Sequence, residues 1–374
     1  MNLLFYLSYV KKYLVVATLG LCIFCFFLTV PALALPMRTI CLVSGPLTEY
    51  NNVLYGIALT LHANGCLDQP LPSNTKTDNV EHLWQWMSEH TNSDIRFLPD
   101  GFYSAMWEDD KFPSIRDEVV KRIETRKDVD AILVFGTRMA KVMSELETDI
   151  PIIVTSVTNP IDSGIITSYD DPGKDNLIVL VSPKRFKKQV ELFHQFFKFK
   201  KLGIVYEDNP IGRSEVSLNE IQAAANNLNI TLSSCKTILH DNDINIITDN
   251  ILECHKNLIR QQVDAIYLTS SVELPPKHIR YTLTPIIAAN IPTFSQSGVS
   301  DVKSGALLSL VNPDIVEGKY AGQVLMKLIT GMLPKKIDNK FYQPILLAIN
   351  LRTAASIGWN PPLDVLLLVD EFYE

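Results

Sequence analysis

The loops that follow the apolar segments of this chain are rich in serine, threonine, asparagine and glycine. These residues offer hydroxyl and backbone N–H groups to a polar ligand, but none of the loops places a nucleophile beside a base. The side chains that we expect to contact a small ligand are Ser44, Thr137, Asn159, Ser214, Ser270 and Ser271. Thr137 is the strongest candidate because Gly136-Thr137 opens an expected helix, whose first N–H groups attract an anion such as a carboxylate.

Each candidate also has a structural alternative. Thr137 could serve only as a helix cap, Asn159 could only order the turn before Pro160, and the serines could be solvated loop residues. Three aromatic side chains of the stretch Cys66–Phe112 raise a similar choice. Either they pack a local core, or one of them reaches over the ligand as a stacking wall; they are Phe102, Tyr103 and Trp107.

No motif of a common enzyme class occurs: G-x-S-x-G, H-E-x-x-H, a Walker loop and G-x-G-x-x-G are all missing. The histidines do not cluster, and His82 and His90 on one expected helix supply only two metal ligands. The formal charge is −7 and becomes −9 without Lys11 and Lys12 of the leader, which argues against nucleic-acid binding. We therefore expect no enzyme activity, no cofactor, no metal site and no nucleic-acid partner.

Residues 1–34 have the pattern of a secretory signal peptide. Lys11 and Lys12 precede the apolar run Tyr13–Leu35, and Ala32-Leu33-Ala34 provides the small residues of a cleavage site. A retained membrane anchor is the alternative, because a run of this length could cross a bilayer. In either case the remainder lies in the periplasm or another extracytoplasmic compartment and meets the membrane only through an uncleaved leader.

Four cysteines follow the leader, and an oxidising compartment permits two disulfides. Sequence proximity favours Cys41–Cys66 and Cys235–Cys254. The other connectivities, and four free buried thiols, stay open as alternatives.

Apolar, β-branched runs alternate with segments of helical spacing, which is typical of a parallel sheet covered on both faces. Strands are predicted at Thr39–Val43, Ala131–Phe135, Ile150–Val154, Leu177–Leu180, Leu202–Tyr206, Ala265–Leu268 and Ile291–Phe294. Helices are predicted at Tyr50–Ala63, Ile115–Arg126, Pro183–Phe197, Ser214–Leu228 and Ile251–Gln262.

The chain also repeats itself. Val129-Asp130-Ala131-Ile132 is followed by a strand that opens with Ile150-Pro151, and Val263-Asp264-Ala265-Ile266 by one that opens with Ile291-Pro292. The two copies stand at equivalent points of matching strand–helix series. The repeat predicts two doubly wound α/β lobes, with ligand contacts beyond the carboxyl ends of the strands.

The segments Phe135–Ala140, Asp149–Val154, Asn159-Pro160 and Gly164–Ile166 resemble the ABC-transporter substrate-binding family related to the tryptophan- and tyrosine-binding proteins. Further matching segments follow in order, so the resemblance covers roughly residues 38 to 362. One departure is Thr269-Ser270-Ser271, where the family often has an aspartate that can meet a ligand amine; Glu273 could substitute for it.

The resemblance implies a type I periplasmic-binding fold: two doubly wound parallel-sheet lobes joined by a hinge that the chain crosses three times. The expected crossings are Thr155–Asn159, Phe294–Ser297 and Lys335–Pro344. Lobe 1 would then comprise 37–157 plus 292–337, and lobe 2 would comprise 158–291 plus 338–374.

The function that follows is an extracytoplasmic solute-binding protein that captures a small ligand, such as an amino acid or aromatic compound, and delivers it to an ABC permease. A membrane-associated sensory ectodomain is the main alternative, and an extracellular enzyme is the third. The identity of the ligand does not follow from the sequence, because it depends on side-chain geometry inside the cleft.

Leader processing is directly testable. If Ala34 is the last leader residue, protein exported by its native host should begin at Leu35 and fractionate as a soluble protein. Intact-mass measurement decides the point. A full-length mass together with membrane association would show that the leader is retained and would favour the sensory alternative.

Overall fold

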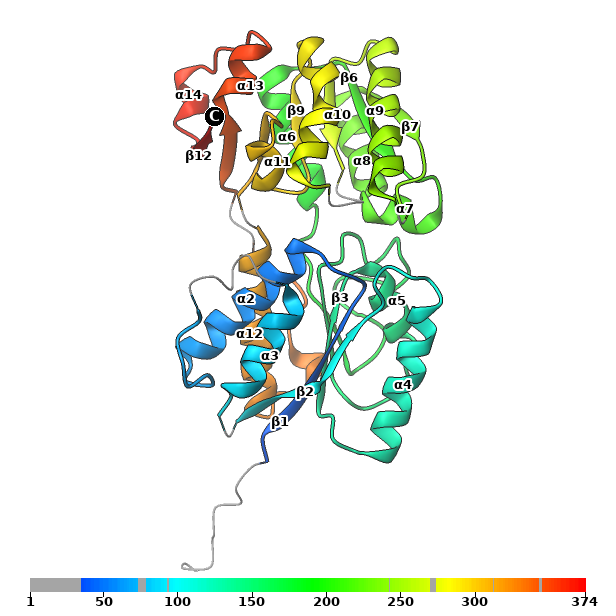
Figure 1. Cartoon of the computed structure of the whole chain (residues 1–374), viewed down its shortest axis with the longest axis vertical. Helices are drawn as coiled ribbons and strands as arrows, with labels where there is room; N and C mark the ends of the chain where they lie inside the picture. Colours follow the sequence, from blue (N-terminus) through cyan, green and yellow to red (C-terminus); the bar gives the residue numbers. More distant parts are fainter. Residues whose placement is uncertain are drawn as a thin grey trace, which may run out of the picture. The chain divides into compact units, whose positions relative to one another are not determined.

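The computed structural model describes residues 35–72, 79–92, 94–241, 243–269, 274–311, 313–342 and 345–374. The predicted signal peptide at 1–34 lies outside them. From Met37 to Glu374 the chain forms two sheets, each covered by helices (Figure 1). The prediction of an α/β protein with two parallel-sheet lobes is therefore confirmed.

The first sheet has five parallel strands in the order β2-β1-β3-β4-β5. Its strands are β1 (Met37–Val43), β2 (Ile95–Ser104), β3 (Ala131–Phe135), β4 (Ile152–Thr155) and β5 (Leu177–Val179). Its helices are α2 (Thr48–Ala63), α3 (Val80–Glu89), α4 (Lys111–Thr125), α5 (Thr137–Ser144) and α12 (Pro313–Ile329), followed by the 3-10 turn η1 (Pro334–Lys336). All five residues of β3 are buried, as expected for a strand that is covered on both faces.

The second sheet has seven strands in the order β12-β11-β10-β9-β8-β6-β7, and only the β10–β11 pair is antiparallel. Its strands are β6 (Lys201–Tyr206), β7 (Thr231–Lys236), β8 (Ala265–Leu268), β9 (Thr293–Ser295), β10 (Leu308–Leu310), β11 (Leu347–Asn350) and β12 (Val369–Tyr373). Its helices are α6 (Arg185–Phe197), α7 (Pro210–Glu215), α8 (Leu218–Leu228), α9 (Ile244–Arg260), α10 (Pro276–Ala288), α11 (Val299–Lys303), α13 (Leu351–Ser356) and α14 (Leu363–Leu366).

Successive side chains of each strand enter different cores. In the first sheet, Cys41 and Val43 pack under α2, α3 and α12, whereas Ile40 and Leu42 pack under α4 and α5. This alternation follows from the period of two along a strand, so an apolar run is needed to fill both cores. The second sheet is divided in the same way between a core under α6 and α8 and one under α9 and α10.

Helix α12 comes from the C-terminal half of the chain but covers the first sheet beside α2. Their backbones approach closely at Gly318, where a Cβ atom would lie 2.0 Å from the carbonyl oxygen of Val53. Only glycine fits such a contact. The chain therefore leaves the first sheet after β5, returns to it at α12 and leaves again before β11.

These crossings differ from the predicted boundaries in two places. Strand β5 pairs with β4, so the chain stays with the first sheet beyond Asn159. Strands β9 and β10 pair within the second sheet, so the return comes after Leu310 rather than at Phe294–Ser297. In both cases the backbone of the additional strand pairs with a strand of that sheet. The third crossing falls between η1 and β11.

The segment predicted as one helix at Ser214–Leu228 forms two helices. The chain turns at Ser217, whose φ of 54° is incompatible with a continuous helix. The stretch between Cys66 and Phe112 contributes α3, in the region of the helix expected to carry His82 and His90, and β2, which was not predicted. There Trp84 is fully buried, packs edge-on against Phe97 at 4.9 Å and donates a hydrogen bond to the Leu98 carbonyl.

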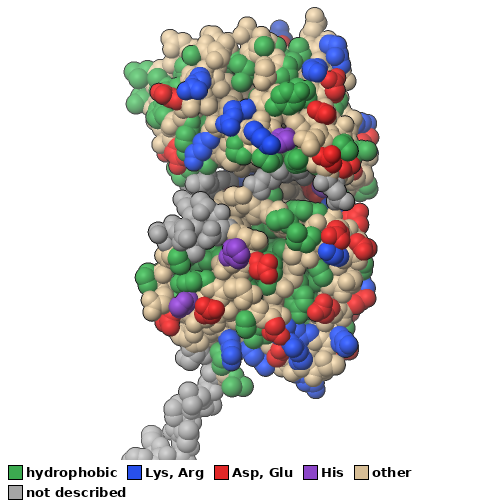
Figure 2. Space-filling model, in the orientation of Figure 1, with side chains coloured by type: hydrophobic (Ala, Val, Ile, Leu, Met, Phe, Trp, Pro, Cys, Tyr) green, Lys and Arg blue, Asp and Glu red, His purple; other side chains and the backbone are tan. Residues whose placement is uncertain are grey.

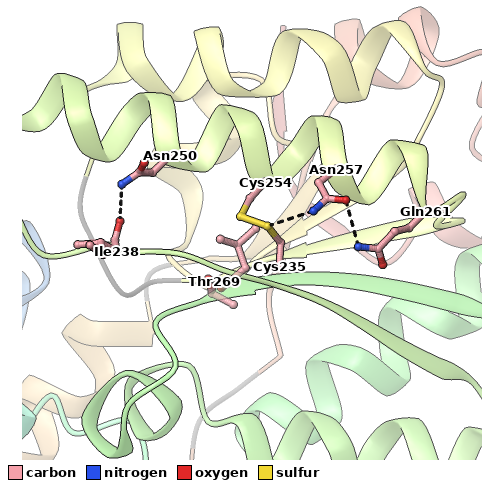
Figure 3. The surroundings of a disulfide bond; sticks show 8 residues. Cys235, Ile238, Asn250, Cys254, Asn257, Gln261 and Thr269 are labelled. Carbon is pink, nitrogen blue, oxygen red and sulfur yellow. Dashed lines mark hydrogen bonds between the residues drawn. A yellow bond between two sulfur atoms is a disulfide. The ribbon is translucent and has the colours of Figure 1, made fainter.

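One of the two favoured disulfides is present. Cys235 on β7 is bonded to Cys254 on α9, which ties the edge strand to the helix that covers it (Figure 3). Cys41 and Cys66 are not bonded, contrary to the favoured pairing. Cys41 faces the core from β1, and Cys66 instead lies 3.5 Å from the sulfur of Met326 on α12.

The bonded pair predicts a redox-dependent stability. The disulfide spans 19 residues, so in the chain-entropy model it should stabilise the fold by about 3 kcal/mol. Reductant should therefore lower the midpoint of urea unfolding of the parent protein. It should leave the midpoint of the Cys235→Ala/Cys254→Ala variant unchanged. An equal effect of reductant on both proteins would contradict the assignment.

Candidate ligand-binding cleft

A cavity of about 760 Å³ lies where loops of both lobes meet, beyond the carboxyl ends of strands of the first sheet. Its wall includes the loops after β1, β2, β3 and β4 on one side, and α7 with the segment after β7 on the other. Loops at this edge of a parallel sheet are where α/β proteins bind ligands, because the side chains there are not needed for the core. Acidic residues of the wall are Glu49, Glu108, Asp109, Asp110, Glu215 and Asp241. Figure 2 shows such side chains on both lobes, on the side of the view where Figure 1 labels α5 and α7.

Thr137 is the predicted ligand-contact residue that lines this cavity. It is the first residue of α5, and its side chain is 7% exposed. Among the described residues, none forms a hydrogen bond with its hydroxyl. The hydroxyl and the first turn of α5 are thus available to an acceptor inside the cavity.

Ser44 supports α5 from beneath. Its Oγ donates to the Phe135 carbonyl at 3.2 Å and accepts from the Met139 N–H at 3.2 Å, so both roles of the hydroxyl are filled. The preceding turn is made by Gly136 with a φ of 91°, where a Cβ atom would lie 2.0 Å from the Tyr50 hydroxyl. Ser44 therefore positions the helix start and is absent from the cavity wall formed by the described residues.

Asn159 and Ser214 contact each other across the two lobes. The Ser214 hydroxyl donates to the Asn159 carbonyl at 3.0 Å, and the Asn159 side chain bonds the backbone N–H and the carboxylate of Asp162. Both residues are buried, and neither belongs to the described cavity wall. The Asn159 side chain therefore orders the turn Asn159–Asp162, close to its structural alternative of a turn before Pro160, and its role as a ligand contact stays a prediction. Ser270 and Ser271 lie outside the described residues.

Two aromatic rings line the cavity. Tyr50 on α2 and Trp107 after β2 lie 6.2 Å apart, and the Trp107 indole N–H donates to the Pro46 carbonyl at 3.3 Å. Trp107 has a φ of 63°, a conformation that bulky residues adopt only where the surroundings hold them. The other aromatic candidates lie elsewhere: Phe102 packs on the first core, and the Tyr103 hydroxyl accepts from Arg122.

A chain of charged groups crosses from one lobe to the other along the cavity. Arg138 on α5 binds Asp109 at 2.9 Å and reaches Glu215 on α7 at 3.3 Å. The other oxygen of Glu215 lies 3.5 Å from His240, whose second ring nitrogen binds Glu207 at 2.7 Å. Burial raises the pKa of Glu215, while His240 and Arg138 oppose the rise. None of these residues was predicted as a ligand contact: Arg138 lies in the family-like segment Phe135–Ala140, where only Thr137 was singled out, and the others stand in no motif.

A second group of carboxylates adjoins the cavity where α2 and α12 begin. Glu317 is buried, and its Oε1 accepts from the Ser156 N–H at 2.6 Å. Burial raises its pKa to about 7, against the opposing effects of that hydrogen bond and of Arg185. The pKa of Glu49 is also raised, by burial and by the charges of Asp314 and Glu317. The carboxyl groups of Glu49 and Glu317 are therefore partly protonated near neutral pH.

Within the described part of the chain, no group of three or more His, Cys, Asp and Glu side chains could hold a metal ion. No described helix is long and apolar enough to span a bilayer.

Two α/β lobes with a cavity between them at the strand ends define a bilobed binding protein. The family model described as "ABC transporter substrate binding protein" matches residues 112–371, and the chain belongs to that family. Its members are substrate-binding proteins and not enzymes, in agreement with the prediction.

Individual relatives are distant. The chain is 23% identical over 224 residues to a tyrosine-binding protein of Clostridioides difficile. That match spans 57% of this chain and 61% of the relative's length. The fold resembles an ABC domain from Streptococcus pneumonia in complex with L-Trp, with a TM-score of 0.67 and 16% identity over 90% of this chain and 99% of that one. A solute-binding protein of R. palustris in complex with 4-hydroxybenzoate has a TM-score of 0.55 and 13% identity over 84% and 92%.

The raised pKa of Glu317 predicts how stability depends on pH. Between about pH 4.5 and 7 the folded state binds more protons here than the unfolded state, so stability falls as the pH rises. Glu317→Gln keeps the acceptor for Ser156 but has no charge. It should be more stable than the parent at pH 8 by about 1–3 kcal/mol and equal to it near pH 4.

Urea unfolding at pH 4, 6 and 8 measures this effect. The matched control is Glu118→Gln, an exposed position on α4, which should leave the pH profile of the parent unchanged. If Glu317→Gln instead destabilises the protein at pH 8, Glu317 is needed as a carboxylate.

Proposed function

We propose that this chain is an exported receptor that captures a small ligand between its two lobes and delivers it to an ABC permease. The observation that carries the proposal is the cavity with the unpartnered Thr137 hydroxyl, in a chain of the substrate-binding family. The leader pattern at residues 1–34 supports export to the periplasm or another extracytoplasmic compartment.

The cavity wall offers groups that suit opposite charges of one ligand. Thr137 and the first turn of α5 suit an acceptor such as a carboxylate, because a helix N-terminus favours negative charge. Glu49 and Asp241 are among the carboxylates that suit a cationic or N–H group. Tyr50 and Trp107 offer ring faces to an aromatic or cationic part of the ligand.

These features support an amino acid or a small aromatic compound as the ligand. The names of the similar proteins, which mention tyrosine, L-Trp and 4-hydroxybenzoate, point in the same direction. Arg138 could strengthen the acceptor end, since it lies next to Thr137 on α5 and lines the same cavity.

A thermal-shift screen over amino acids, aromatic acids and small amines tests the proposal. A ligand that binds only the folded protein stabilises it by about 2.7 kcal/mol at a hundredfold excess over Kd. Thr137→Val keeps the shape of the side chain and removes its hydroxyl. It should weaken binding of the best hit by about 1.5–3 kcal/mol if the hydroxyl donates to a charged group.

The matched control is Thr125→Val on the exposed end of α4, which should bind the hit as tightly as the parent does. If Thr137→Val also binds it unchanged, the ligand does not contact this hydroxyl. Delivery is tested in the native host: uptake of the hit should be lost when the gene for this receptor is deleted. Uptake without it would refute that role.

A further inference from the structure

A second cavity, of about 440 Å³, adjoins the first and extends into the second lobe. The two cavities share Leu47, Glu49 and Leu239 as wall residues, so they meet at this point. The second cavity runs between α9 and α10 and over the ends of β6 and β8. Its inner wall is mainly apolar and includes Val205, Ile251, Leu268, Ile279, Leu283 and Val299.

Most polar groups of the inner wall already have partners within the protein. The Thr269 hydroxyl donates to the Val205 carbonyl at 2.6 Å, and the Thr282 hydroxyl donates to the Ile279 carbonyl at 2.9 Å. The apolar residues of the inner wall therefore offer hydrocarbon to a ligand group, whereas Glu49, Asp301, Lys303 and Asp314 add charged side chains to the rest of the cavity wall.

His255 is the exception. It projects from α9 into this wall and is 3% exposed. Its Nδ1 lies 2.8 Å from the Thr282 carbonyl, which can only accept, so the ring proton is on Nδ1. Burial lowers the pKa of His255 to about 4, which keeps the ring neutral. Its Nε2 is thus a lone-pair acceptor for which no described residue is a donor.

An acceptor without a partner in an apolar wall is costly unless a ligand or solvent group satisfies it. We propose that the second cavity is the subsite for the apolar body of the ligand, and that His255 Nε2 accepts a hydrogen bond from one O–H or N–H group on that body. The inference rests on the proposed receptor function and narrows its ligand class to apolar, ring-sized groups that carry a single donor. A phenol or an indole has this chemistry.

Two probes of similar size, one with a hydrogen-bond donor and one without, distinguish the contribution of the hydrogen bond to affinity from that of apolar burial. Phenol carries a donor and fluorobenzene does not, while both fit the cavity. Their dissociation constants for the purified protein are measured by equilibrium dialysis. We expect phenol to bind about fivefold more tightly than fluorobenzene, the ratio for one neutral hydrogen bond.

His255→Asn keeps a donor close to the Thr282 carbonyl and removes the acceptor at the Nε2 position. It should abolish the preference for phenol while fluorobenzene binds as before, and this second result also shows that the pocket is intact. Val299→Trp should fill the cavity and prevent binding of both probes. The matched control is His278→Asn. It alters the contact between His278 on α10 and Thr248 on α9, which lies outside the cavity wall. It should retain the preference.

Equal binding of phenol and fluorobenzene to the parent protein, or binding of both that persists in Val299→Trp, would overturn the proposal. The two hypotheses fail separately. If a hit from the thermal-shift screen binds His255→Asn and Val299→Trp as tightly as the parent, the receptor function is supported and the subsite is refuted. His255-dependent phenol binding without any hit would retain the subsite and refute the receptor.

Discussion

The first sheet cannot be buried by the segments that connect its own strands. One of its faces is covered by α2 and α3, but the remaining surface is filled by Ala321, Val324 and Leu325 of α12, which follows the strands of the second lobe in sequence. Because a parallel sheet is stable only with both faces covered, the chain has to return to the first lobe after β10 and leave it again before β11. The chain therefore crosses between the lobes two further times so that α12 can pack closely against α2, as it does at Gly318.

This packing also places charge at the cleft. Helices α2 and α12 begin at the strand ends, so Glu49 in the first turn of α2 and Glu317 in the second turn of α12 approach each other and Ser156 after β4. Burial of two carboxylates in one region disfavours their ionised forms, and a cationic ligand group would restore them. The α2–α12 contact within the first lobe thus brings acidic groups to the cleft, while the first turn of α5 is suited to an anion.

The elements predicted correctly from sequence are those whose position follows from one local hydrophobic pattern. Strands β3 and β8 are continuous apolar runs, and both begin and end at the predicted residues. Strand β2 was missed because Pro99, Asp100 and Gly101 interrupt it, and the structure accommodates them by a shift of register against β1. The hinge boundaries were displaced because pairing of β5, β9 and β10 depends on distant strands, which local hydrophobicity does not reveal.

In the candidate site, too, the sequence reveals local signals but not contacts between distant residues. Thr137 could be proposed from sequence because Gly-Thr at a helix start is a local signal, and its role as a ligand contact stays a prediction. Ser44, Asn159 and Ser214 have similar residue types and loop positions. Yet the hydroxyls of Ser44 and Ser214 bond carbonyls far away in sequence, and the Asn159 side chain bonds nearby Asp162. Conversely, His255 lies within an amphipathic helix where sequence suggests only core packing. Its importance arises because Thr282 on the next helix fixes the proton on one ring nitrogen and leaves the other facing a cavity.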